Sequence, residues 1–323
     1  MKFLRFTFPI ALFLSQVGFS ACPDVRLDKS SLKNVPVLDQ DGSGICWAYT
    51  AAAMIDAYRF SHGDKNTAVI TSPIALAVFA NQDAFMTGLK QQTAIRGARN
   101  GDGQPDTAIE IARNQGKVCD HRTVSKELIS TDIAAIDFDG TYKLDTFEFQ
   151  CPSFLEKLWY DFFPSTTKMA VTVKHMALWA LSGDVKKLCA QLEAPVALPK
   201  TQFVSAYTMA TQRPPINVAD RLKTLLGKQN PQPVGLQYCA DVLRKPELQS
   251  LDIYKYVSKC DNKHWSVIVG SREGKNGKCD FLVRNSFGSS CDGYSSSTCE
   301  SRGQIWVTED SLVNNTGALS WLE

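Results

Sequence analysis

The chain has 323 residues, of which 44% are hydrophobic and 21% are charged, and 35 lysines and arginines against 33 aspartates and glutamates leave a formal charge of +2. This composition excludes a disordered chain and predicts a globular protein with one large core or two smaller ones. The balanced charge excludes nucleic acid and anionic membranes as expected partners, and we expect a monomer.

The first twenty residues are typical of a secretory signal peptide. Lys2 and Arg5 precede an apolar run from Phe6 to Leu14, and small residues follow it. The run is shorter than the roughly 20 apolar residues that a transmembrane helix needs. We therefore expect cleavage after Ser20, no transmembrane segment, and a secreted or periplasmic protein.

The sequence around the cleavage site allows a second interpretation. Residues 19–22, Phe-Ser-Ala-Cys, resemble a bacterial lipobox with Phe where Leu is usual. The alternative is therefore a protein anchored to a bacterial membrane by a lipid on Cys22.

Three blocks of different hydrophobic periodicity follow the signal. Residues 21–118 have a helical pattern, residues 119–215 are amphipathic and mostly helical, and residues 216–323 are rich in short apolar strands. In the first block we expect helices over 46–60, 72–81 and 105–114, the last one ended by Gly116.

The second and third blocks differ in their expected elements. The second contains amphipathic stretches at 154–163 and 169–192. In the third we expect a helix near 218–226, an antiparallel sheet, and a turn at 270–277. The expected strands cover residues 234–236, 265–269, 281–283 and 304–307.

Residues 40–48, Gln-Asp-Gly-Ser-Gly-Ile-Cys-Trp-Ala, place a cysteine where a loop meets an Ala-rich helix. The N-terminus of a helix carries partial positive charge, which favours the thiolate form of Cys46, and the thiolate is the nucleophile. The side-chain amide of Gln40 and the N–H of Cys46 can both donate to an oxygen that becomes negative during attack. The segment predicts a catalytic cysteine with an oxyanion hole.

A thiolate nucleophile also needs a histidine that holds the ion pair and protonates the leaving group. His264 begins an apolar, strand-like run, and Asn285 follows the next predicted strand. Asn285 can accept the imidazole N–H and fix the orientation of the ring. The other histidines lie in segments that predict surface or core positions: His62, His121 and His175.

The pattern Gln-x-x-x-Gly-x-Cys-Trp-Ala, together with the segments of His264 and Asn285, resembles the papain family of cysteine peptidases. The resemblance implies an α+β fold with a helical left half that carries Cys46. It also implies a right half formed by an antiparallel β-sheet or barrel, with the active-site cleft between the halves. It implies hydrolysis of protein or peptide substrates through a thioester intermediate.

The separation of Cys46 and His264 exceeds the roughly 130–150 residues typical of this family. Residues 119–215 are long enough to account for the excess as an insertion. The resemblance gives Gly103 the role of the glycine along which a substrate backbone binds. Trp265 stands where a small residue is usual, near the cleft or in the core behind it, and we expect it to contribute to substrate binding on the leaving-group side.

Three other positions also depart from the family's pattern. Ser43 and Asn100 stand where the family has two bonded cysteines, so that bridge is absent as a pair. Phe287 replaces the usual tryptophan after Asn-Ser, and it could still shield the hydrogen bond between the asparagine and the histidine from water.

Ten cysteines in an exported chain predict disulfides. If Cys46 remains a free thiol, nine are left, so at least one more is unpaired or modified. Lipidation of Cys22 would leave an even number. Proximity alone favours two local pairs, Cys260 with Cys279 and Cys291 with Cys299, but it does not fix the connectivity.

Two other functions stay open. A catalytically silent binding protein could keep this fold, and an acyltransferase could resolve the thioester with an amine instead of water. No Cys-x-x-Cys or His-x-x-x-His spacing occurs, so we expect neither a metal nor another cofactor.

Overall fold

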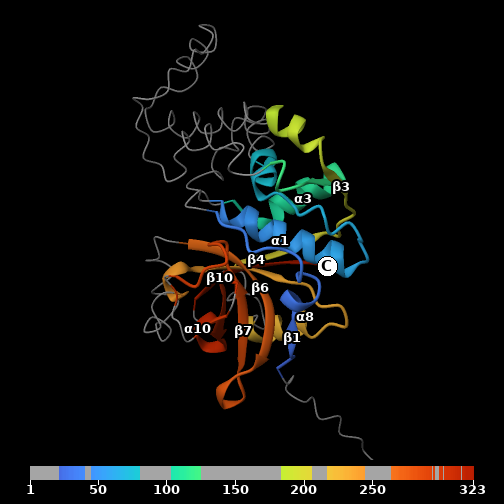
Figure 1. Ribbon diagram of the computed structural model, residues 1–323. Helices are drawn as coiled ribbons and strands as arrows, with labels where there is room; N and C mark the ends of the chain where they lie inside the picture. The colour runs from blue at the N-terminus through green and yellow to red at the C-terminus, as the bar shows by residue number, and fades with distance from the viewer. Residues whose placement is uncertain are drawn as a thin grey trace, which may run out of the picture.

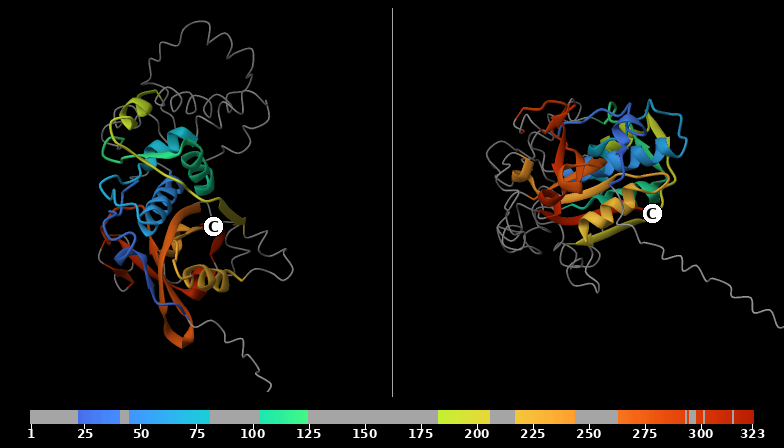
Figure 2. Two further views of the ribbon diagram at one scale, coloured as in Figure 1. Left: turned by 90° about the vertical axis from the view of Figure 1, so that its right-hand side faces the viewer. Right: turned by 90° about the horizontal axis from the view of Figure 1, so that it is seen from below.

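The computed structural model describes residues 22–40, 45–80, 103–124, 183–205, 217–243, 263–292, 294, 298–300, 302–313 and 315–323. These residues form a helical part around helix α1 and a sheet part, seen one above the other in Figure 1 and from two further sides in Figure 2. Among the helices in these ranges, none combines the length and the apolar character that a membrane span requires.

Helix α1, Cys46–Ser61, lies at the centre of the helical part and is buried on nearly all sides. Its frequent alanines have small side chains, which lets helix α3 and strand β6 pack closely against it. Helix α3, Pro105–Gln115, has proline in its first turn and ends at Gly116, whose φ is 68°. The predictions of helices over 46–60 and 105–114 are confirmed, and the one over 72–81 is confirmed for residues 73–80.

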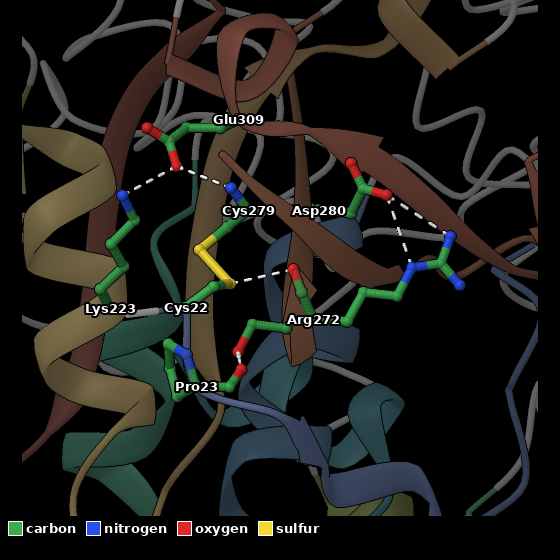
Figure 3. The surroundings of a disulfide bond; sticks show 8 residues. Cys22, Pro23, Lys223, Arg272, Cys279, Asp280 and Glu309 are labelled. Carbon is green, nitrogen blue, oxygen red and sulfur yellow. Dashed lines mark hydrogen bonds and ion pairs between the residues drawn. A yellow bond between two sulfur atoms is a disulfide. The ribbon is translucent and has the colours of Figure 1, made fainter. Parts of the chain in front are cut away.

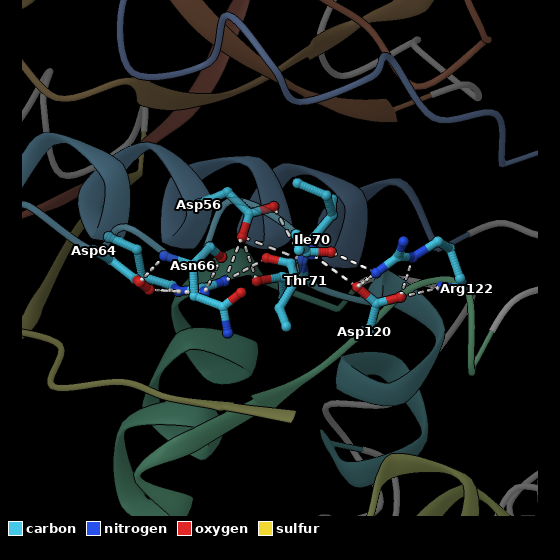
Figure 4. A network of polar contacts seen from close by, with 10 residues as sticks. Asp56, Asp64, Asn66, Ile70, Thr71, Asp120 and Arg122 are labelled. Atoms are coloured by element: carbon cyan, nitrogen blue, oxygen red, sulfur yellow. Dashed lines mark hydrogen bonds and ion pairs between the residues drawn. The ribbon is translucent and has the colours of Figure 1, made fainter. Parts of the chain in front are cut away.

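Buried charges fasten the segment that follows α1 to the helix (Figure 4). Asp56 accepts hydrogen bonds from the Thr71 hydroxyl at 2.6 Å and the Thr71 N–H at 3.1 Å, and it pairs with Arg59 at 3.1 Å. Asp120 accepts the N–H of Ile70 at 3.0 Å. Because the donors surround both carboxylates, these charges are tolerated inside the protein.

The main sheet is antiparallel throughout, in the order β4-β10-β5-β6-β7-β9-β8, with β1 against β6. The strands are β1 Val25–Arg26, β4 Thr201–Ser205, β5 Val234–Cys239, β6 Lys263–Glu273, β7 Cys279–Arg284, β8 Cys299–Glu300, β9 Gln304–Thr308 and β10 Thr316–Leu322. The four predicted strands lie within β5, β6, β7 and β9, and those predictions are confirmed.

Both faces of this sheet are covered. Trp265 and Val267 of β6 belong to the core shared with α1, while Ile268 points into a second core. Helix α8, Val218–Leu226, at the position predicted from the sequence, and the short helix α10, Glu309–Val313, close that second core. The two-sided burial explains why the central strands are almost continuously apolar.

The predicted turn at 270–277 is wrong at its start, because β6 continues to Glu273 and the chain turns at η6, Lys275–Gly277. A Cβ atom on residue 270 would lie 2.6 Å from the carbonyl oxygen of Val25 in β1. The pairing of β6 with β7 also shifts register between Ile268 and Gly270. Gly270 is therefore a strand glycine that lets β1 approach.

The described ends of the block 119–215 contain strands as well as helix. Strand β3, Glu193–Pro195, pairs with β2, Lys117–Cys119, and β4 pairs with β10 at the edge of the main sheet. Residues 183–189 are helical. The predicted amphipathic stretch 154–163 lies outside the described residues, as does 169–192 up to residue 182.

Three disulfides join described residues, Cys22–Cys279, Cys119–Cys189 and Cys291–Cys299, and Cys239 is also disulfide-bonded. The predicted pair Cys291–Cys299 is confirmed. The predicted pair of Cys260 with Cys279 is wrong, because β1 carries the N-terminal segment along β6 and brings Cys22 to Cys279.

The same disulfide corrects the alternative of a lipid anchor at Cys22. A lipid anchor needs a thioether on this sulfur, and here the sulfur is bonded to Cys279 (Figure 3). The N–H of Cys279 donates to Glu309 at 3.0 Å, and Glu309 also binds Lys223 at 3.0 Å. These contacts fix the end of β7 that carries the disulfide.

Candidate active site

Cys46 is the first residue of α1 and, among the cysteines in the described ranges, the one that forms no disulfide. Its side chain is buried, and its sulfur accepts the backbone N–H of Trp265 at 3.4 Å. The first turn of α1 holds no acidic residue, so the partial positive charge of the helix end is not neutralised there. Helix end and N–H donor both favour a thiolate at this position.

His264 is the second residue of β6 and Asn285 follows the end of the adjacent strand β7. His264 Nε2 lies 2.6 Å from Asn285 Oδ1, and both side chains are buried. The backbone N–H of Ser286, which can only donate, reaches the same Oδ1 at 2.8 Å. This identifies the oxygen end of the amide, so Nε2 carries the imidazole proton and Nδ1 is left as the basic nitrogen.

The histidine and the cysteine are brought together by β6. His264 directly precedes Trp265, whose N–H meets the sulfur of Cys46. Tyr238 stands opposite His264 in the β5–β6 ladder. The structure therefore joins the start of α1 to the adjoining ends of β6 and β7.

Gln40 is buried beside Asn285 and Ser286. Its backbone N–H donates to the carbonyl oxygen of Ser286 at 2.8 Å, and its Oε1 accepts the Ser286 hydroxyl at 2.6 Å. The oxygen end of the amide is thus occupied, and Nε2 is the end that can donate to an oxyanion. The Cys46 N–H belongs to the first turn of α1, where backbone N–H groups point out of the helix end, so it can serve as a second donor.

Gly103 packs against the indole of Trp47, the residue after Cys46. A Cβ atom on residue 103 would lie 2.1 Å from Trp47 Cε2. Packing alone therefore requires glycine here, and the role of Gly103 along a substrate stays a prediction.

The side chain of Trp265 lies in the core. It is 2% exposed and belongs to the cluster around α1, with the ring of Phe203 at 6.3 Å. Of the two positions expected for Trp265, the one behind the cleft agrees with this burial. Its role in substrate binding stays a prediction, and the contact that links it to the site is its backbone N–H.

Aromatic rings surround the bond between His264 and Asn285. The ring of Phe287 lies 4.9 Å from the imidazole, where it can exclude water as predicted, and Tyr238 meets the imidazole edge-on at 5.8 Å. Tyr294 stacks on Phe287 at 6.5 Å. Burial raises the pKa of Tyr238 far above its usual range, so this phenol stays protonated.

Sequence reasoning missed three polar partners of Asn285 and Gln40, which are Ser266, Ser286 and Tyr294, and it missed Tyr238, which binds Ser266. Ser266 had a detectable signal, because a serine two positions after His264 interrupts an apolar strand and shares its face. Tyr294 had no such signal, since only the fold brings its loop back to Asn285.

The other residues singled out in the sequence lie elsewhere. His62 stacks on Tyr58 at the C-terminal end of α1, and His121 follows β2. His175, Ser43 and Asn100 lie outside the described residues. Within the described ranges, no three His, Cys, Asp or Glu side chains gather as a metal site would require.

No family model matches this sequence, and no curated protein matches it. Among solved structures, PepW from Lactobacillus rhamnosis HN001 is similar with a TM-score of 0.51 and 12% identity, over 92% of this chain and 81% of that one. The proform of the Amb a 11 cysteine protease, a ragweed pollen allergen, has a TM-score of 0.47 and 16% identity, over 95% of this chain and 66% of that one. Digestive procathepsin L2 from Tenebrio molitor larval midgut has a TM-score of 0.47 and 14% identity, over 95% of this chain and 69% of that one.

At these identities the similarity concerns the fold. The chain has a papain-like α+β fold, with mixed helices and an antiparallel sheet. The solved structures that resemble it include cysteine proteases.

Proposed function

We propose that the protein is an exported cysteine peptidase whose nucleophile is Cys46. The observation that carries the proposal is the junction of α1 with β6 and β7. There a thiol at a helix N-terminus, a histidine with its Nε2 proton held by Asn285, and the Nε2 donor of Gln40 belong to one buried cluster. Nothing in a structural core requires these three groups together.

In the proposed mechanism, the Cys46 thiolate attacks the carbonyl carbon of a peptide bond. Gln40 Nε2 and the Cys46 N–H stabilise the oxyanion, and the imidazolium of His264 gives its Nδ1 proton to the departing amine. Asn285 keeps the ring in the orientation that aims Nδ1 at the reaction. His264 then takes a proton from water, which attacks the thioester and frees the acid product.

The test is hydrolysis of a fluorogenic peptide library by the purified protein, with labelling by a peptide epoxide and mapping of the modified residue. We expect labelling at Cys46, and C46A and H264A should each lower kcat/KM by roughly 10³-fold or more. H62A, which changes an exposed histidine at the other end of α1, should keep the wild-type rate. Wild-type activity in C46A would refute the mechanism.

The same assay separates the alternatives. A thiol that reacts with neither epoxide nor peptide would indicate a silent binding protein. Product masses that include an added amine would indicate acyl transfer.

Export is a part of the proposal that the disulfides support, because such bonds form and persist in oxidising compartments. We expect the secreted or periplasmic protein to begin at Ala21. N-terminal sequencing of protein recovered outside the cytoplasm tests this, and retention of residues 1–20 would contradict it.

A further inference from the structure

Tyr294 reaches the site from a loop that the proposed mechanism does not use. The loop leaves β7, is closed by the disulfide between Cys291 and Cys299, and re-enters the sheet at β8. The N–H of Tyr294 donates to the Cys291 carbonyl at 3.2 Å, which turns the chain back toward Asn285. Its phenolic oxygen accepts the Nδ2–H of Asn285 at 2.7 Å.

Asn285 is held by hydrogen bonds at both ends of its amide. The Oδ1 end accepts the hydroxyl of Ser266 at 3.0 Å, in addition to the imidazole and the N–H of Ser286. The Ser266 hydroxyl has one hydrogen and donates it to Asn285. The Tyr238 hydroxyl, 2.9 Å from Ser266 Oγ, must therefore donate to Ser266. The Nδ2 end donates to the Tyr294 hydroxyl, so both ends of the amide have hydrogen-bond partners.

The orientation of this amide decides which imidazole nitrogen is basic. If the amide turned over, Nδ2 would face His264 and Nε2 would have to accept, which would leave the proton on Nδ1. Smaller rotations would lengthen the bond to Nε2 and let water compete for it. A partner on Nδ2 restricts both movements, because a buried amide N–H without an acceptor is costly.

Tyr294 makes a second contact that supports the same bond. Its ring is nearly parallel to that of Phe287, at 14°, and Phe287 covers His264. The hydroxyl of Tyr294 thus orients the amide of Asn285. The ring of Tyr294 supports Phe287, which keeps water from the amide and the imidazole.

We propose that Tyr294 is a positioning residue of the site, delivered by the loop that the Cys291–Cys299 disulfide closes. This inference rests on the proposed peptidase function. It makes the completed site depend on oxidation of Cys291 and Cys299 to their disulfide, which is remote in sequence from the nucleophile.

The first experiment is a double-mutant cycle on peptide hydrolysis. Y294F removes the acceptor but keeps the ring, and should lower kcat roughly 3- to 30-fold, the cost of one hydrogen bond, with KM little changed. The alkaline limb of the kcat/KM profile should move to lower pH, because a less firmly held Asn285 stabilises the protonated imidazole less. In an N285A background, Y294F should cost nothing further, since its effect passes through Asn285.

Matched controls separate positioning from general damage. Y58F changes a tyrosine at the far end of α1 and should leave the kinetics unchanged. C291A/C299A should lower kcat at least as much as Y294F does, whereas C22A/C279A, which opens the disulfide at the other end of β7, should not. If Y294F does not fold, the comparison of kcat between C291A/C299A and C22A/C279A tests the proposal.

These experiments distinguish failure of the Tyr294 positioning role from failure of the proposed peptidase function. A wild-type protein that neither hydrolyses peptides nor labels at Cys46 overturns the function, and the positioning role falls with it. An active wild type with Y294F equal to it in rate and pH profile, or an equal loss in the N285A background, overturns the positioning role alone.

Discussion

The indole of Trp47 determines what residue 103 can be. The close approach of Gly103 to this ring predicts that G103A displaces Trp47, which is 4% exposed and adjacent to Cys46. We expect the free energy of unfolding to fall by about 1–3 kcal/mol, as for overpacked cores. Urea unfolding measures this.

A matched glycine provides the control for this variant. Gly183 has open space around its Cβ position, so G183A should change stability little. Enlarging the space in the double variant G103A/W47F should recover part of the loss. A neutral G103A would show that the indole is not fixed as described.

At the scale of residues, the candidate nucleophile Cys46 and its proposed partners could be predicted, because each lies in a short stretch of chain with its own pattern; the partners are His264, Asn285 and Gln40. Their supports could not. Tyr238 matters because it stands opposite His264 in the β5–β6 register, and Ser286 because its hydroxyl meets Gln40. Register and loop return are properties of the fold, and neither is encoded in the local sequence.

At the scale of elements, the sequence predicted helices and strands with strong apolar patterns and missed those without one. Strand β10, Thr-Gly-Ala-Leu-Ser-Trp-Leu, mixes small and polar residues, yet it is buried between β4 and β5. β1 and β8 have two residues each, too short for any periodicity. The extent of β6 beyond Gly270 was hidden because the approach of β1 requires a glycine there.

The disulfide between Cys22 and Cys279 links the N-terminal segment to the hairpin of β6 and β7. It closes a loop of 257 positions, so its removal should release much chain entropy on unfolding. We expect C22A/C279A to lower the free energy of unfolding by about 2–4 kcal/mol while kcat stays at the wild-type value.

Unfolding monitored by circular dichroism, beside peptide hydrolysis, checks both parts of this prediction. Unchanged stability would mean that β1 and its contacts hold the N-terminal segment without the bond.

Asp56 gives the helical part a defined pH dependence. Burial raises the pKa of Asp56 to about 6, despite Arg59 and the Thr71 donors. A carboxyl whose pKa is higher in the folded state contributes most below the unfolded value near 3.9, and this contribution is lost as the pH rises through about 6. The stability of the wild type relative to D56N should therefore fall, by on the order of 2 kcal/mol, between pH 4 and pH 7.

Urea unfolding of the two proteins across this range measures the difference, which cancels the other titrating groups. D184N, at an exposed carboxylate paired only with Lys187, should show no such trend relative to the wild type. A stability difference that rose with pH would mean that Arg59 outweighs burial.

At the scale of the whole molecule, the site exists because the two parts of the fold meet at it. The α+β fold class could be predicted from the motifs, but the pairing of the N-terminal segment with the sheet could not. Residues 38–40 lie along residues 286–288. Asp39 and Phe287 form an isolated antiparallel β-bridge, and the N–H of Gly288 donates to the Leu38 carbonyl at 3.2 Å. Gln40, the proposed oxyanion donor, is thus held by the part of the fold that carries His264.

This connection predicts that Ser286 governs the amide of Gln40. S286A removes the hydroxyl that occupies Gln40 Oε1, so the amide can rotate and present its oxygen to the reacting carbonyl. We expect kcat to fall about tenfold with KM nearly constant, against roughly 10²- to 10³-fold for Q40A. S289A, at an exposed serine of the same loop, should have no effect. Because the hydroxyl acts only through the amide, S286A should add nothing to Q40A; an additive loss would assign Ser286 a separate role in the site.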